Sequence, residues 1–145
     1  MSSTHHSFSG KWGEKYQWEG ARSRVYQMQD SGTVTENWLI GKAESAENFA
    51  LRFYEVQPHC STKEEKHAHD HGIVILQGQA DIEINGAVRP VKQGDVVFIA
   101  PNDLHVLHNT GDGLLGFFCI IPAKRIKKDQ LVWAEGDFFD EKPSS

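Results

Sequence analysis

Cysteine is scarce in this chain, since only Cys60 and Cys119 occur among its 145 residues. Two thiols so far apart in the sequence exclude the dense disulfide framework of small secreted domains. A long apolar run is also missing, and no segment resembles a signal peptide or a membrane span. We therefore expect a cytoplasmic protein that has free thiols and no membrane partner.

Clustered positive charge is absent as well. The chain has 15 Lys and Arg residues against 20 Asp and Glu residues, which gives a formal net charge of −5 at pH 7. Proteins that bind nucleic acids present basic patches. We expect a small-molecule substrate and no nucleic-acid partner, and the length of 145 residues fits one domain.

Sustained helical periodicity is missing too, and short apolar segments separated by turn residues take its place. This pattern indicates an all-β sandwich or barrel. Asn85-Gly86 tolerates positive φ at both turn positions and predicts a tight hairpin. Phe53 and Phe98 are expected in the core. The predicted strands are 35–40, 50–56, 73–76, 80–84, 87–91, 95–99, 105–109 and 114–121.

The N-terminal residues 1–31 are polar and irregular, apart from the aromatic residues Trp12, Tyr16, Trp18 and Tyr26. We expect a partly mobile arm that lies along the barrel or across a second subunit. Sheet edges of small barrels need covering, and such an arm can cover them, which favours a homodimer.

Residues 32–122 are expected to form the barrel core, and residues 123–145 a C-terminal segment that packs on the barrel or is mobile. The charge run at 123–128 is interpreted as a solvated face or a short helix. Phe138 and Phe139 make the tail too apolar to be simply disordered.

Histidines occupy alternate positions in His67-Ala68-His69-Asp70-His71, and His105 follows after a β-type run. Alternate residues of a strand share one face, whereas a turn near Asp70–Gly72 would place His71 on the next strand, facing the first two. Either geometry brings three imidazoles together. Because imidazole is the commonest protein ligand for divalent transition metals, the pattern predicts a metal site. The alternative is an exposed loop without a ligand.

The run from His67 to Gly78 resembles the first cupin motif, in which histidines and a glutamate precede a strand and a glycine. The run from Gly94 to Asn109 resembles the second motif, although Ala100 and Asn102 replace the common proline and glycine. Asn tolerates a left-handed conformation, so the turn can survive that change.

This resemblance covers residues 50–122 and implies a double-stranded β-helix, or jelly-roll barrel. His71 stands where many cupins have the glutamate ligand. The chain therefore resembles the small single-domain cupins with four histidine ligands, which implies His67, His69, His71 and His105 around one divalent metal. Iron, manganese, nickel, zinc and copper all remain open.

Charge limits the chemistry of such a centre. Four neutral imidazoles leave the metal its full positive charge, which favours an anionic or chelating substrate. Three functions remain open: a dioxygenase, an isomerase or lyase that acts through a metal-bound enediolate, and a non-catalytic small-molecule binder.

Cys119 shares one face of its predicted strand with Phe117 and Ile121. If that face is the barrel interior, the thiol lies near the metal as a catalytic nucleophile or acid; otherwise it is a small buried hydrophobe. Cys60 is expected on a loop surface. The runs 51–56, 67–78 and 116–119 are similar to cupin-type methylthio-xylulose-phosphate methylsulfurylases, which implies thiol release from a sugar phosphate as a further possibility.

Overall fold

The computed structural model describes residues 3–136, and these residues form antiparallel β-structure with one short 3-10 helix, η1 (Lys42–Glu44). No helix in this range is long and apolar enough to cross a membrane. The strands are β1 (Arg22–Gln29), β2 (Gly32–Ile40), β3 (Phe49–Val56), β4 (His71–Gln77), β5 (Gln79–Ile84), β6 (Ala87–Lys92), β7 (Val96–Ile99), β8 (His105–His108), β9 (Leu115–Pro122), β10 (Lys124–Lys127) and β11 (Gln130–Trp133).

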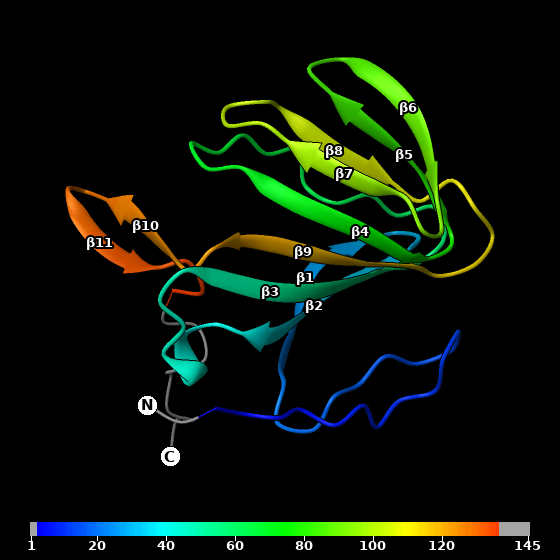
Figure 1. Ribbon diagram of the computed structural model, residues 1–145. Coiled ribbons are helices and arrows are strands. Elements are labelled where there is room, and N and C mark those ends of the chain that lie inside the picture. The colour runs from blue at the N-terminus through cyan, green and yellow to red at the C-terminus, as the bar shows by residue number, and fades with distance from the viewer. Residues whose placement is uncertain (1–2, 137–145) are drawn as a thin grey trace.

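Two sheets make up the barrel. A six-stranded sheet has the order β1-β2-β3-β9-β4-β7, and a three-stranded sheet has the order β6-β5-β8. Figure 1 shows the smaller sheet above the larger one, with the β10-β11 hairpin projecting at one end. This arrangement confirms the predicted all-β jelly roll.

The six-stranded sheet is apolar on both faces. On β3, Ala50, Tyr54 and Val56 point into the main core, whereas Leu51 and Phe53 belong to a second cluster on the opposite face. Strand alternation therefore creates one core between the sheets and one outside them. The outer face needs a cover.

The N-terminal arm supplies that cover from the same chain. Tyr16 and Trp18 place their ring centroids 4.7 and 5.2 Å from that of Phe53, and Trp18 also contacts Phe118. The arm (blue in Figure 1) runs beneath the six-stranded sheet. Of the two predicted locations, the structure shows the arm along its own barrel.

Strand β1 was not predicted, because residues 1–31 were interpreted as one irregular arm. Its residues pair with β2 from Arg22 opposite Trp38 to Gln29 opposite Gly32, with a bulge between Val25 and Gln27. The bulge breaks the alternation of exposed and buried side chains, so the sequence lacks the period of a strand.

The charge run at 123–128 does not form a short helix. Lys124–Lys127 is a strand that pairs with Gln130–Trp133, and its side chains are mostly exposed, so the solvated-face alternative is correct. The Lys124 ammonium lies 4.6 Å from the centroid of the Trp133 ring. Phe138 and Phe139 lie outside the described residues.

Turn predictions are confirmed at three positions. Asn85 and Gly86 have φ of 50° and 84°, as the hairpin between β5 and β6 requires, and Asn102 has φ of 68°. Two burial predictions are wrong. Cys60 is fully buried. Phe98 is 66% exposed, because the register of β7 directs its side chain to the outer face of the sheet, where it does not join the second cluster.

Candidate metal centre

Three elements bring the histidines together. His71 begins β4, as the turn alternative predicted, but the chain bends at Ala68 and His69, earlier than the predicted turn near Asp70–Gly72. His71 pairs with Ile99 of β7. His105 begins β8 in the opposite sheet, so its imidazole reaches the centre from the other side of the barrel.

The nitrogens of His67, His71 and His105 form a compact group. One nitrogen from each imidazole lies within 4.8 Å of the others. His71 and His105 are buried, while His67 is half-buried. Three convergent imidazoles suit a divalent transition metal.

His69 does not belong to this group of three. Its ring stacks on His67 with centroids 4.9 Å apart and lies 4.7 Å from the ring of His71, while its Nδ1 lies 3.1 Å from the carbonyl oxygen of Asp70. The structure thus brings together three of the four predicted ligands, and His69 stays a prediction.

Hydrogen bonding at the buried imidazoles fits a metal. Among residues 3–136, Nε2 of His71 is buried and has no hydrogen-bond partner, which is costly for a polar atom. His105 uses Nδ1 to donate to the carbonyl of Asp103 at 2.9 Å, which leaves Nε2 with its lone pair. Two buried nitrogens are therefore available as ligands.

The protonation state of His71 suits the same role. Burial, together with the nearby His105 and Arg52, lowers the pKa of His71 to about 3. Burial also lowers the pKa of His69. Only a neutral imidazole coordinates a metal, so His71 is in its ligand form across the neutral range.

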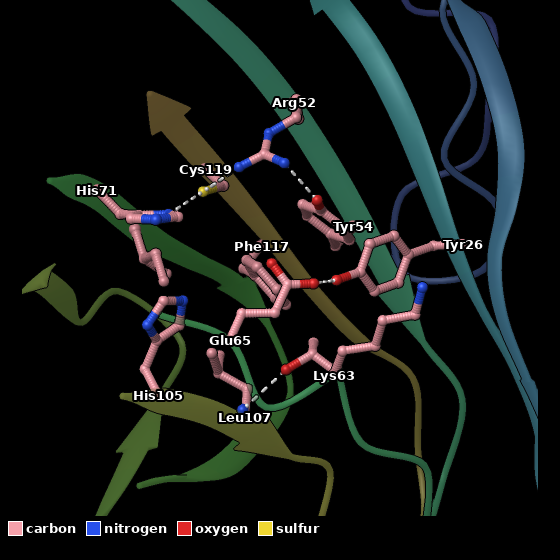
Figure 2. A pocket seen from close by; sticks show the side chains of 12 residues that line it. Tyr26, Arg52, Tyr54, Lys63, Glu65, His71, His105, Leu107, Phe117 and Cys119 are labelled. Carbon is pink, nitrogen blue, oxygen red and sulfur yellow. Dashed lines mark hydrogen bonds between the residues drawn. The ribbon is translucent and has the colours of Figure 1, made fainter. Parts of the chain in front are cut away.

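A cavity of about 50 Å³ adjoins the histidines, as Figure 2 shows. The cavity is lined by Tyr26, Arg52, Tyr54, Thr62, Lys63, Glu65, His71, Ile73, His105, Leu107, Phe117 and Cys119.

Cys119 faces the barrel interior, which the sequence left open. Its Sγ lies 3.5 Å from Nδ1 of His71 and accepts a hydrogen bond of 3.0 Å from Nη2 of Arg52. Burial raises the pKa of the Cys119 thiol, and the charge of Arg52 opposes that rise. The sulfur thus lies beside both a candidate metal ligand and a cation.

A buried chain of hydrogen bonds holds Arg52 in place. Nη1 of Arg52 donates to the Tyr54 hydroxyl at 2.6 Å, and this hydroxyl donates to Oε2 of Glu36 at 2.7 Å. Glu36 is fully buried, and its other oxygen accepts from Arg24 and Trp38. Burial lowers the pKa of Arg52, but Tyr54, Cys119 and Glu36 together outweigh it and keep that pKa high, so the guanidinium stays charged.

The sequence pattern did not identify Arg52, Glu65 or Tyr26 as residues of this site. The register of β3 was open, Glu65 lies in a charged run that resembles a solvated flank, and Tyr26 lies on the unpredicted β1. The strand alternation that places Tyr54 inward would have placed Arg52 inward too.

Comparison with known proteins supports this description. Residues 52–121 match the family model described as Cupin domain. The chain is 32% identical over 117 residues to the 1-methylthio-D-xylulose 5-phosphate methylsulfurylase of Rhodospirillum rubrum, and the match covers 78% of this chain and 73% of that protein.

Solved structures agree with the sequence comparison. A cupin-2 domain protein of Rhodospirillum rubrum has a TM-score of 0.69 at 30% identity, covering 80% of this chain and 78% of that one. A cupin 2 domain-containing protein of Halorhodospira halophila has a TM-score of 0.60 at 28% identity, covering 93% and 87%. With the jelly-roll barrel and the clustered histidines, these matches establish that the chain belongs to the cupin family.

Proposed function

We propose that this cupin is a metal-dependent enzyme that cleaves the carbon–sulfur bond of a small ketose phosphate carrying a methylthio group. The observation that carries the proposal is the position of the Cys119 sulfur, which shares a cavity with His71 and His105 and lies 3.0 Å from Arg52. The relative from Rhodospirillum rubrum, named for its action on 1-methylthio-D-xylulose 5-phosphate, supports this substrate class.

His67, His71 and His105 would hold the metal, with His69 as a fourth ligand. Such a metal supplies Lewis acidity that polarises a carbonyl oxygen. The neutral imidazoles cancel none of its charge, which suits an anionic substrate with two neighbouring oxygens.

We assign Cys119 the role of nucleophile rather than acid. Burial raises the pKa of the Cys119 thiol, and Arg52 opposes that rise because its positive charge against the sulfur stabilises the thiolate. The thiolate is the nucleophilic form of cysteine. Its attack on the methylthio sulfur would form a mixed disulfide between Cys119 and the methylthio group, while the electron pair of the broken carbon–sulfur bond stays on the sugar carbon, which takes up a proton. The dithiol then reduces the mixed disulfide, which releases methanethiol and restores the thiol. Because the chain of Tyr54 and Glu36 fixes the guanidinium, the stabilising charge is already in place before substrate binds.

The test supplies metal-loaded protein with 1-methylthio-D-xylulose 5-phosphate and an excess of dithiol reductant, and measures methanethiol by gas chromatography. We expect release by the wild type and by Cys60→Ala, which removes the other buried thiol, and none by Cys119→Ala. Metal-loaded wild type that releases no thiol would refute the proposal. Substrate-dependent uptake of dioxygen in the same reaction would instead favour the dioxygenase.

An isomerase acting on a phosphorylated ketose is the second candidate. One observation favours it: the carboxylate of Glu65 and the hydroxyl of Tyr26 line the same cavity as His71 and His105 and form an acid–base pair. Exchange of the hydrogen next to the carbonyl of xylulose 5-phosphate with deuterated water, without thiol release, would identify this activity.

A further inference from the structure

Glu65 joins the histidine group to the N-terminal strand. Its Oε2 lies 2.7 Å from Nε2 of His67, and its Oε1 accepts a hydrogen bond from the hydroxyl of Tyr26. Figure 2 shows the Glu65 carboxylate turned toward this hydroxyl within the cavity. Each oxygen of the carboxylate thus has its own donor.

The backbone fixes where this carboxylate lies. Glu65 forms an isolated antiparallel bridge with His105, in which each backbone N–H donates to the carbonyl of the other residue, at 3.0 and 2.9 Å. Glu65 is therefore pinned to the first residue of β8, which itself supplies a histidine to the centre. A shift of Glu65 along the loop would break both bonds.

Contacts with Tyr54 and Lys63 hold the Tyr26 ring in place. Its ring meets that of Tyr54 edge-on, with centroids 5.4 Å apart, and the Lys63 ammonium lies 4.9 Å from the ring centroid. Burial and the Glu65 carboxylate raise the pKa of Tyr26, so its hydroxyl remains protonated and donates. The aromatic residue comes from β1, which joins the barrel through β2.

The bond to Glu65 also sets the tautomer of His67. A carboxylate accepts, so Nε2 of His67 carries the proton and Nδ1 keeps the lone pair. A histidine with a fixed ring and tautomer needs no further ordering when it binds a metal.

We propose that Glu65 and Tyr26 are positioning residues, which orient His67 and fix its tautomer for metal binding through Nδ1. This inference rests on the metal centre of the proposed function, but it does not depend on the substrate. It makes the N-terminal strand a part of the metal centre.

The chain contains a matched control pair. His108 contacts Glu83 through Nε2 at 3.5 Å, and Ser61 lies 2.7 Å from its Nδ1. His108 is outside the group of three histidines that can hold a metal. The side chains of His108 and Glu83 are about as exposed as those of His67 and Glu65. Glu83→Ala therefore removes a carboxylate from a histidine in a comparable environment.

The experiment measures the Zn²⁺ affinity of the full-length protein by competition with a chromophoric chelator. We expect Glu65→Ala to weaken binding about tenfold to 100-fold, and Tyr26→Phe to weaken it about threefold to tenfold. Glu65→Gln, which retains an acceptor oxygen, should restore part of the loss. Glu83→Ala should bind as the wild type does.

A second measurement separates orientation from general destabilisation. Long-range ¹H–¹⁵N correlation spectra of the metal-free proteins report the tautomer of each histidine. We expect a single tautomer of His67 with the proton on Nε2 in the wild type, and a mixture in Glu65→Ala, while thermal unfolding remains cooperative in both.

Two outcomes would overturn the inference and are distinguishable. If the wild type binds Zn²⁺ and Glu65→Ala binds it equally well, the positioning role is wrong and the metal centre stands. If the wild type binds no Zn²⁺ while its spectra show a folded protein, the metal centre itself is wrong, and the positioning role with it.

Discussion

Phe53 packs the edge of its ring against Gly116 on the neighbouring strand, where an added Cβ would lie 2.7 Å from Cζ of Phe53. This contact lies in the second core, between the six-stranded sheet and the N-terminal arm. Because Gly116 has no side chain, the Phe53 ring has room to pack beneath the N-terminal arm.

Replacing this glycine should destabilise the fold. We expect Gly116→Ala to lower the free energy of unfolding by about 1–3 kcal/mol, because the extra methyl group overpacks a full core. Gly113→Ala is the control, since its Cβ would meet nothing within 4 Å. Urea unfolding of both variants gives the comparison, and equal stabilities would contradict this account of the contact.

Removal of a histidine should cost metal. We expect His71→Ala and His105→Ala to lose at least about tenfold to 100-fold in metal affinity, because in the proposed centre each would supply a buried ligand nitrogen. Elemental analysis of protein purified without a tag measures the metal content, with the exposed His59 replaced as the control.

His69 provides a separate test of the fourth ligand. We expect His69→Ala to weaken metal binding as well, by less than His71→Ala, because His69 is outside the group of three histidines whose ligand atoms lie within 4.8 Å of one another. A metal content and affinity identical to those of the wild type would limit the centre to three histidines.

Stability of the metal-free protein should fall in acid. His71 has a pKa of about 3 in the folded protein, against the ordinary value of 6.5 expected in the unfolded chain. As the pH falls, the unfolded chain therefore binds a proton at this residue before the folded protein does. The unfolding free energy therefore decreases as pH falls from about 6.5 toward 3. His69, whose pKa is also lowered, acts in the same direction.

Urea unfolding of metal-free protein at several pH values measures this effect. His71→Gln removes the titrating group, so its stability should vary less over the same range than that of the wild type. Equal pH profiles for wild type and variant would show that His71 is protonated as readily in the folded protein as in the unfolded chain.

Arg52 should control the reactivity of Cys119. In a Cys60→Ala background, we expect Arg52→Gln to raise the pKa of the Cys119 thiol further and to slow its alkylation near neutral pH, because the guanidinium no longer stabilises the thiolate. Arg89→Gln, on the exposed face of β6, is the control. The rate of iodoacetamide labelling as a function of pH reports the result, and coincident pH profiles for Arg52→Gln and Arg89→Gln would refute the role.

The strands of the barrel could be predicted because their sequence alternates and their turns carry diagnostic residues such as Asn85-Gly86. The β1 and β10 strands could not, because a bulge interrupts one and exposed charges cover the other. Backbone pairing in such edge strands is independent of side-chain period.

Some residues of the candidate site could likewise be predicted from the sequence, and others could not. The spacing of His67, His71 and His105 with the adjacent glycines carries a local signal, and the structure brings these three residues together. Arg52 and Tyr26 gain their roles only from strand register and from contacts between distant segments, which no local pattern encodes.

The ladder between β4 and β9 has a consequence for how this centre can evolve. His71 precedes Gly72, which pairs with Ile120, and Ile73 pairs with Cys119, so the imidazole and the sulfur sit at diagonal positions of adjacent strands. Sliding one strand by a single residue would turn its side chain to the other face, and sliding by two would move it about 7 Å. A change of register can therefore alter the distance between the sulfur and the imidazole only by several ångströms at a time. Reactivity here must be tuned by exchanging side chains around a fixed frame, not by small adjustments of the backbone.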